Sequence, residues 1–223
     1  MQDLKKIIRG FIFDFDGTII VSEHVHMLAW EDLAKSVGNP LPDGYLEHSV
    51  GLSDLELIKI LASAWRHELS EREILTRKRA FYMSRAPSEC SEVPGVVSAI
   101  NSLHSRGYPV AVATSSSREE VIPVLERLEI IDCFKSIVTV DDITHPKPDP
   151  EIYFRAAGDL GLTPRDCLAF EDSKAGVESA RKAGCALVTL QTLYDAKTLG
   201  PALLSAKDFT EPALKDLLGT FVL

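Results

Sequence analysis

The sequence predicts an α/β fold: a Rossmann-like, doubly wound parallel sheet with an all-helical segment inserted after the first strand. Short apolar segments alternate with helical segments over the second half of the chain, which is the pattern of a parallel sheet with right-handed crossovers. The first strand, 7–15, is apolar on both faces, as a central strand of such a sheet requires. The stretch 21–92 is too long for one crossover, so we expect a core of 1–20 and 93–223 and a helical cap of 21–92.

Composition excludes several classes of function. The chain has 223 residues and a formal charge of −9, which argues against an extended surface for nucleic acid or anionic membranes. No apolar run reaches membrane-spanning length. The four cysteines are scattered, without the spacing of a zinc site, and are expected to be reduced thiols in a cytoplasmic protein. We expect a monomer that acts on a small molecule.

The cap is expected to contain helices and no strand. Its first helix, Ser22 to Val37, has apolar residues at helical spacing and ends at the Gly38-Asn39-Pro40 breaker. Segments 43–49, 54–66 and 71–85 are also helical in pattern, with Ser53 and Ser70 at N-cap positions.

The core continues with four more strands, at 108–113, 136–140, 167–170 and 186–190. Helices are expected between them, at 96–103, 119–128, 152–160 and 175–183. The tail, 203–218, resembles a short strand followed by a helix.

Polar groups follow the predicted strands at their carboxyl ends. In chain order they are Asp14 and Asp16, Thr114 with the serines after it, Lys147, and Glu171 with Asp172. The carboxyl ends of parallel strands lie along one edge of a sheet, so we expect these groups to converge. Asp14 and Asp16 repel each other beside an apolar core, and a bound cation would relieve both the repulsion and the burial.

This set of residues suits phosphoryl transfer. A phosphate monoester repels nucleophiles until its charge is neutralised. Asp14, Asp172 and one backbone carbonyl can hold Mg²⁺, a hard cation that prefers oxygen ligands. Asp14 can then attack phosphorus, and Asp16 can protonate the leaving oxygen. Thr114 and Lys147 would stabilise the phosphoryl oxygens.

Each residue also has a purely structural interpretation. Asp16 and Gly17 can form a turn, and Thr114, Ser115 or Asp172 can cap the helix that follows. Lys147 taken alone reads as a surface lysine. The combination of four such groups in order favours the catalytic interpretation.

The motifs resemble those of the haloacid dehalogenase superfamily, in its branch of phosphatases and phosphomutases with a helical cap (subfamily I). The matching pieces are DxDGT at 14–18, the strand ending in Thr114, KPDP at 147–150 and FEDSxxG at 170–176. The resemblance implies a Rossmann-like core, Mg²⁺ dependence and an aspartyl-phosphate intermediate. It implies Asp14 as nucleophile, Asp16 as acid/base with its carbonyl on the metal, Asp172 as metal ligand and Glu171 at or near the metal shell.

Within the superfamily, the sequence is most similar to β-phosphoglucomutase and the sugar-phosphate phosphatases. This likeness implies a substrate-binding role for five residues of the cap and of the loop after the second strand: His26, Lys78, Ser115, Ser116 and Arg118. One departure counts against a mutase. After Gly51-Leu52-Ser53, where the mutase has a phosphate-binding arginine, this chain has Asp54, which would repel a second phosphate.

The hypothesis is therefore a Mg²⁺-dependent phosphatase for a small phosphorylated metabolite, and we expect a sugar or polyol phosphate. The nearest alternative is a phosphosugar mutase. A non-catalytic phospho-acceptor module resembling a receiver domain, and a DxD glycosyltransferase suggested by the first motif alone, are more remote. Opening of the cap is expected to use hinges near 18–22 and 92–95.

Overall fold

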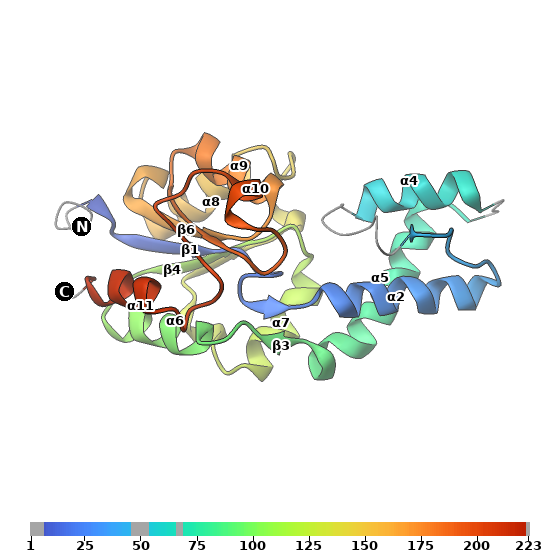
Figure 1. Cartoon of the computed structure of the whole chain (residues 1–223), viewed down its shortest axis with the longest axis horizontal. Helices are drawn as coiled ribbons and strands as arrows, with labels where there is room; N and C mark the ends of the chain where they lie inside the picture. Colours follow the sequence, from blue (N-terminus) through green and yellow to red (C-terminus); the bar gives the residue numbers. More distant parts are fainter. Residues whose placement is uncertain (1–6, 46–53, 66–68, 222–223) are drawn as a thin grey trace. The chain divides into compact units, whose positions relative to one another are not determined.

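The computed structural model describes residues 7–45, 54–65 and 69–221 (Figure 1). The chain divides into two compact units: a core, Met1–Val21 with Ser91–Leu223, and a helical cap, Ser22–Cys90.

The core is built on a six-stranded sheet in the order β5-β4-β1-β6-β7-β8, and all neighbouring strands in it are parallel. The strands are β1 (Gly10–Phe13), β4 (Val110–Ala113), β5 (Ser136–Val138), β6 (Cys167–Glu171), β7 (Ala186–Leu190) and β8 (Leu204–Ala206). This confirms the doubly wound α/β fold. The order reverses at β1, so the crevice that binds ligands in such folds opens at the carboxyl end of this strand.

Successive side chains of β1 serve opposite faces of the sheet. Ile12 packs in a cluster with Tyr153 and Val177, from helices α8 (Glu151–Leu160) and α9 (Lys174–Ala183). Phe11 and Phe13 point the other way, into a group of aromatic rings that includes Phe170, Phe209 and Phe221. In Figure 1, α8 and α9 lie on one side of the sheet, and α6 (Val96–Ser105) and α11 (Pro212–Gly219) lie on the other. Burial on both faces explains why the first strand is apolar throughout.

Two very short strands lie where the chain passes between the core and the cap. β2 (Ile20–Val21) and β3 (Ser91–Glu92) pair antiparallel, with Ile20 opposite Glu92 and Val21 opposite Ser91. The expectation of no strand in the region up to residue 92 is therefore wrong at its end. Two residues are too few to produce the alternating pattern by which a strand is recognised in a sequence.

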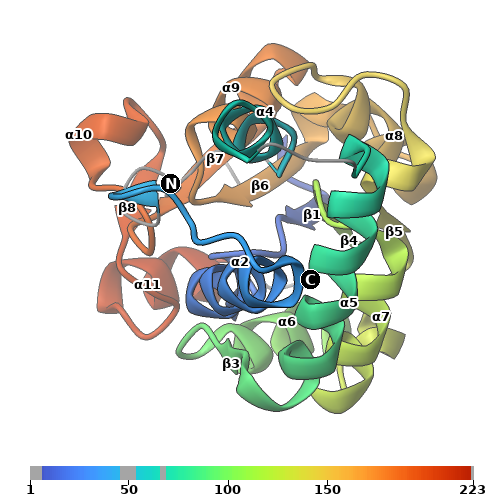
Figure 2. The ribbon, with the colours of Figure 1, turned by 90° about the vertical axis from the view of Figure 1, so that its right-hand side faces the viewer.

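The cap contains α2 (Glu23–Val37), α4 (Asp54–Ala64) and α5 (Glu71–Glu89). α2 and α4 are seen nearly end-on in Figure 2, while α5 runs across the view. Gly38 adopts a left-handed conformation (φ 71°) and ends α2. Ser70 caps α5 through a capping box with Glu73, which confirms its predicted role. Ser53 and most of the predicted segment 43–49 lie outside the described residues.

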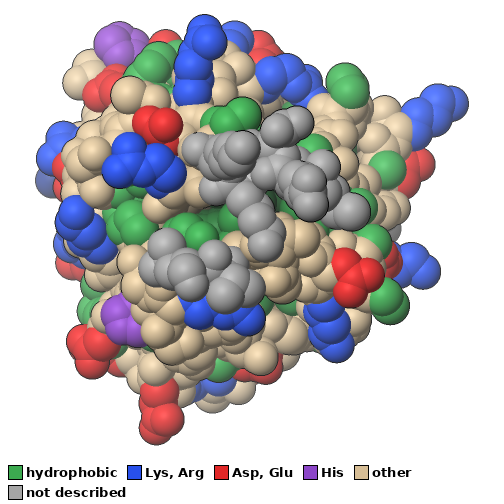
Figure 3. Space-filling model, turned by 90° about the vertical axis from the view of Figure 1, so that its left-hand side faces the viewer, with side chains coloured by type: hydrophobic (Ala, Val, Ile, Leu, Met, Phe, Trp, Pro, Cys, Tyr) green, Lys and Arg blue, Asp and Glu red, His purple; other side chains and the backbone are tan. Residues whose placement is uncertain are grey.

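The remaining core elements follow the predicted order with small shifts at their ends. α7 (Arg118–Arg127) is capped by Ser117, and a short α10 (Ala196–Leu199), absent from the sequence prediction, follows β7. None of the helices in the described ranges is long and apolar enough to cross a membrane. On the face shown in Figure 3, basic and acidic side chains are intermixed.

Candidate active site

Lys147 contacts three strand ends of the core. Its Nζ donates to Oδ1 of Asp14 over 2.7 Å, to Oε1 of Glu171 over 2.6 Å and to the carbonyl of Ala113 over 2.9 Å. The lysine side chain is 4% exposed, so the surface interpretation of this residue is wrong. These bonds bring the ends of β1, β4 and β6 to one point, where the sheet order predicts convergence.

Glu171 is the last residue of β6, and it is held by several groups of the core. The Tyr153 hydroxyl donates to Oε1 over 2.6 Å, and the Ser173 hydroxyl donates to Oε2 over 3.2 Å. Its carboxylate lies against Gly176 of α9, where an added Cβ would lie 2.0 Å from either oxygen. Both carboxylate oxygens of Glu171 therefore have protein donors.

Asp172 follows directly and lies against the loop after β1. A Cβ on Gly17 would stand 1.8 Å from its Oδ2 atom, a contact that only glycine permits here, and the φ of Gly17 is also positive at 73°. The Thr192 hydroxyl lies 3.0 Å from the same Oδ2 and 2.6 Å from the carbonyl oxygen of Gly17. Ser173, and not Asp172, caps α9, since its side chain accepts from Gly176 N–H.

The loop after β4 contacts the second aspartate of the motif. The Ser116 hydroxyl donates to Oδ2 of Asp16. Thr114 is 1% exposed, and its hydroxyl accepts the backbone N–H of Ser116 over 3.0 Å. Since Ser117 caps α7, Thr114 does not serve as the cap of that helix. Thr114 instead shapes the turn that carries Ser116 to Asp16.

Burial and mutual repulsion dominate the electrostatics of the cluster. Burial, followed by the charge of Glu171, raises the pKa of Asp14 from 3.8 to about 8 in the absence of a metal, although Lys147 opposes the change. Burial and the charges of Asp14 and Glu171 raise the pKa of Asp172 well above its ordinary value, and the Thr192 hydrogen bond acts in the opposite direction. Burial would lower the pKa of Lys147, but the two carboxylates outweigh it and raise that pKa.

Asp14, Glu171 and Asp172 can offer oxygen atoms that all lie within 4.8 Å of one another. Lys147 supplies one positive charge against these three buried carboxylates, so the cluster lacks positive charge when all three are ionised. An all-oxygen donor set with excess negative charge fits a hard divalent cation such as Mg²⁺. Asp14 and Asp172 are the better candidate ligands, because Glu171 already accepts hydrogen bonds at both oxygens.

The two predicted cap residues also meet. Lys78 is fully buried, and its Nζ lies 2.8 Å from Nδ1 of His26 and 2.9 Å from Oδ2 of Asp54. The His26 ring stacks on Tyr82 with 4.1 Å between centroids, and Lys78 lies over the Trp30 ring. The charge of Lys78 is therefore compensated within the cap.

The last two predicted substrate residues, Arg118 and Ser115, form no hydrogen bond with the carboxylate cluster among the described residues. Arg118 donates to the Asp142 carboxylate and to the carbonyl of Ile137, over 2.8 and 2.9 Å. Its side chain is 48% exposed, and these bonds tie it to the end of β5. Ser115 is exposed in the same loop.

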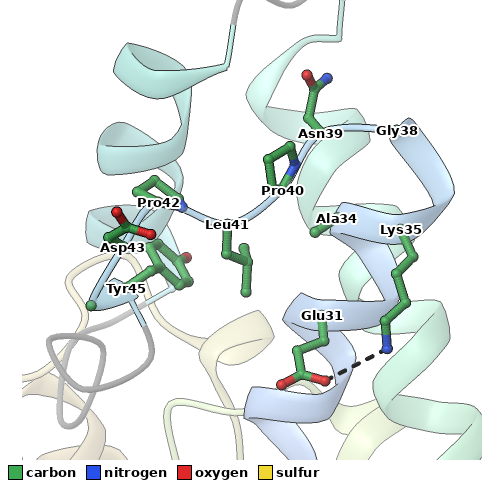
Figure 4. A pocket seen from close by; sticks show the side chains of 11 residues that line it. Glu31, Ala34, Lys35, Gly38, Asn39, Pro40, Leu41, Pro42, Asp43 and Tyr45 are labelled. Carbon is green, nitrogen blue, oxygen red and sulfur yellow. Dashed lines mark ion pairs between the residues drawn. The ribbon is translucent and has the colours of Figure 1, made fainter.

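The cap also contains an open hollow of about 540 Å³ at the end of α2 (Figure 4). Its lining comes wholly from residues of the cap between Glu31 and Tyr45, and an ion pair of Glu31 with Lys35 lies on its edge. None of the predicted site residues lines it, so we do not identify it as the active site.

Sequence reasoning missed two groups that touch the cluster. Thr192 follows β7 at the same edge of the sheet, so the rule that selected the other polar residues at strand ends would also have selected it. Tyr153 lies on the apolar face of α8, where an aromatic residue is indistinguishable from ordinary core.

A parallel sheet of this order, with a lysine and three buried carboxylates at its carboxyl edge and a helical insert between β2 and β3, defines a doubly wound α/β protein with a cap and a candidate cation site. The family model of the haloacid dehalogenase-like hydrolases matches residues 11–190, and the chain belongs to this family. The predicted class of enzyme, a phosphatase of this family, is thereby confirmed.

Named relatives are similar over most of their length. The validoxylamine A 7'-phosphate phosphatase of Streptomyces hygroscopicus subsp. limoneus is 33% identical, over 90% of this chain and 93% of its own. A phosphorylated carbohydrates phosphatase of Thermotoga maritima is 32% identical, over 84% and 88%. The crystal structure of β-phosphoglucomutase from Clostridium difficile superimposes with a TM-score of 0.78 at 26% identity, covering 96% of this chain and 97% of the other.

Proposed function

We propose that this chain is a Mg²⁺-dependent phosphatase that hydrolyses a small phosphorylated metabolite, a sugar or polyol phosphate, through an aspartyl-phosphate on Asp14. The observation that carries the proposal is the bond from Lys147 to both Asp14 and Glu171 beside Asp172, three buried carboxylates around one lysine. The relative named as a phosphorylated carbohydrates phosphatase supports the substrate class.

In the first step, a carboxylate oxygen of Asp14 attacks phosphorus and the bond from phosphorus to the ester oxygen breaks. Asp16 gives its proton to the leaving oxygen. The Ser116 hydroxyl, hydrogen-bonded to Asp16, orients that carboxyl group. Lys147 and Thr114 face the charge that develops on the phosphoryl oxygens.

In the second step, Asp16 takes a proton from water, and the water oxygen attacks phosphorus. The bond between phosphorus and Asp14 then breaks, which regenerates the carboxylate and releases inorganic phosphate. Asp16, two residues after the nucleophile, thus acts first as an acid towards the leaving oxygen and then as a base towards water.

Mg²⁺ would be held by Asp14, Asp172 and a backbone carbonyl of the 14–18 loop. Glu171 would lie at or near this metal shell. When bound, the cation would neutralise phosphate charge and favour the ionised form of Asp14. The raised pKa of Asp14 supports this assignment, since a protonated carboxyl is a poor nucleophile and needs a nearby positive charge to ionise at neutral pH.

A phosphosugar mutase of the same mechanistic class would return the phosphoryl group to a sugar and must hold a second phosphate. Asp54 stands where the mutase has a phosphate-binding arginine, and the predicted substrate-binding lysine of the cap, Lys78, is buried and paired with this same Asp54. This pairing favours the phosphatase. The cap would act as a lid that hinges near 18–22 and 92–95, and closure would exclude bulk water from the intermediate. A monomer in the cytoplasm is the simplest setting, with its thiols reduced.

The test is a panel of sugar and polyol phosphates with MgCl₂, in which released phosphate and isomerised sugar are measured together. Wild-type protein should release phosphate without isomer. Asp14→Asn should lose about a thousand-fold or more of this activity, whereas Asp216→Asn, a change at an exposed aspartate of α11, should not. Isomer formation without phosphate release would establish the mutase, and normal turnover by Asp14→Asn would refute the proposed nucleophile.

A further inference from the structure

Thr192 stands at a junction of three loops at the carboxyl edge of the sheet. It follows β7, whose neighbour in the sheet is β6, and β6 in turn pairs with β1. Asp172 and Gly17 belong to the loops after these two strands. The Thr192 hydroxyl therefore connects segments that are 20 and 175 residues away in the chain.

The contacts of this hydroxyl are short and specific. Its oxygen lies 2.6 Å from the Gly17 carbonyl oxygen and 3.0 Å from Oδ2 of Asp172. Both partners are acceptors, so the single hydroxyl proton is shared between them or given to one at a time. The Cα of Gly17 is also so near that a Cβ there would lie 1.8 Å from the same Oδ2. Gly17 and the Thr192 hydroxyl thus both adjoin the carboxylate of Asp172.

We infer that Thr192 is a positioning residue of the metal site. Its hydroxyl orients the Asp172 carboxylate directly and the 14–18 loop through the Gly17 carbonyl, so that the carboxylate and a backbone carbonyl of this loop can serve as ligands of Mg²⁺. This inference rests on the proposed Mg²⁺-dependent function. Ligating carboxylates are commonly oriented by an outer hydrogen-bond donor, and loss of such a donor weakens metal binding by about 10- to 100-fold.

The alternative is that Thr192 only stabilises the loop after β7. The two roles predict different results, because a structural role would affect the stability of the metal-free protein, while a positioning role would affect the affinity for Mg²⁺. The exposure of Thr192 makes a large effect on folding unexpected.

The experiment uses the full chain and four variants. Thr192→Val and Thr192→Ala remove the hydroxyl in two different shapes, Thr192→Ser keeps it, and Thr198→Val makes the same change at an exposed threonine of α10. Calorimetric titration of metal-free protein with MgCl₂ gives Kd directly. Thermal unfolding with and without MgCl₂, and hydrolysis of p-nitrophenyl phosphate across Mg²⁺ concentrations, give two further readouts.

Thr192→Val and Thr192→Ala should raise the Kd for Mg²⁺ by about tenfold or more, and the half-saturating Mg²⁺ concentration in hydrolysis should rise by the same factor. The rate at saturating Mg²⁺ should recover most of its wild-type value. Thr192→Ser should bind as wild type does, and so should Thr198→Val. The metal-free variants should melt at the wild-type temperature, while the rise in melting temperature caused by Mg²⁺ should shrink.

A Kd for Mg²⁺ that stays at the wild-type value in both hydroxyl deletions overturns the inference, whatever happens to hydrolysis. Equal weakening in Thr192→Ser and Thr192→Val also overturns it, since the hydroxyl would then not be the cause. If Mg²⁺ affinity depends on the hydroxyl but the wild-type protein releases no phosphate from any ester, the inference stands and the proposed phosphatase function fails.

Discussion

In the metal-free protein, Asp14 should make stability fall as pH rises. Its pKa is 3.8 when unfolded and about 8 in the fold, first because of burial. Between pH 3.8 and about 8, the Asp14 carboxyl therefore keeps its proton in the folded protein and has lost it in the unfolded chain. The stability associated with the protonated carboxyl is fully present below pH 3.8 and is lost as pH rises towards 8.

The magnitude follows from the size of the pKa change. Each pH unit in this window removes about 1.4 kcal/mol from the free energy of unfolding. At pH 7 the accumulated loss from Asp14 is on the order of 4 kcal/mol, which is a large part of the stability of an ordinary domain. Asp14→Asn keeps the size of the side chain and cannot ionise, so it should escape this loss. At pH 7 the variant should be more stable than the wild type by a similar amount.

The assay is urea unfolding of both proteins in EDTA at several pH values between 4 and 8. Far-ultraviolet circular dichroism should follow the transition, because both tryptophans, Trp30 and Trp65, lie in the cap and their fluorescence reports on that unit. The difference between the two proteins isolates Asp14 from groups that titrate in both. Parallel pH curves, or a wild type that is the more stable protein at pH 7, would refute the reasoning. MgCl₂ should remove the difference by stabilising only the wild type.

Three further changes probe the surroundings of the cluster. Gly176→Ala should cost about 1 to 3 kcal/mol of stability and reduce phosphatase activity, because the added methyl would meet the Glu171 carboxylate at 2.0 Å. Tyr153→Phe removes a buried donor to Glu171 and should cost about 1 to 3 kcal/mol in thermal or chemical unfolding. The Cys167 thiol, whose pKa burial raises to about 12, should react with an aromatic disulfide reagent only after the protein unfolds.

Controls exist for these changes. Gly158 lies in α8 with open space around its Cα, so Gly158→Ala should stabilise the protein by about 0.4 to 1 kcal/mol. A loss at Gly158 as large as that at Gly176 would show that the crowding at Glu171 is not the cause. Unchanged stability of Tyr153→Phe would mean that the hydroxyl is replaced by another donor. Rapid modification of Cys167 in the native protein would contradict its burial.

The sheet and its polar edge were predictable because they rest on short-range patterns. An apolar strand followed by Asp14 and Asp16 can be recognised from neighbouring residues, and parallel topology then brings the later strand ends to the same edge. The prediction that Lys147 and Glu171 lie near Asp14 needed only this topology. Their direct bonds could not be read from the sequence, because each depends on rotamers set by packing far along the chain.

Other parts of the site lacked a usable pattern. The pairing of Lys78 with Asp54 joins two helices of the cap, and an amphipathic pattern tells which face is buried but not which charges meet across it. The sequence predicts that Asp54 repels a second phosphate, and in the structure its carboxylate also neutralises the buried Lys78. Tyr153 could not be distinguished from core, because its hydroxyl matters only through a partner that is 18 residues away.

The pairing of β2 with β3 determines where the chain leaves the core for the cap and where it returns. Val21 and Ser91 are opposite each other, so the chain leaves the core and returns to it at adjacent points, about 5 Å apart. The stretch Ser22–Cys90 thus takes the place of the loop in a β-hairpin formed by β2 and β3. An insert of another size or shape can occupy the same two ends without disturbing the register of the six-stranded sheet. The two ends of the cap are therefore held by β2 and β3, which lie outside the six-stranded sheet whose carboxyl edge carries the carboxylate cluster.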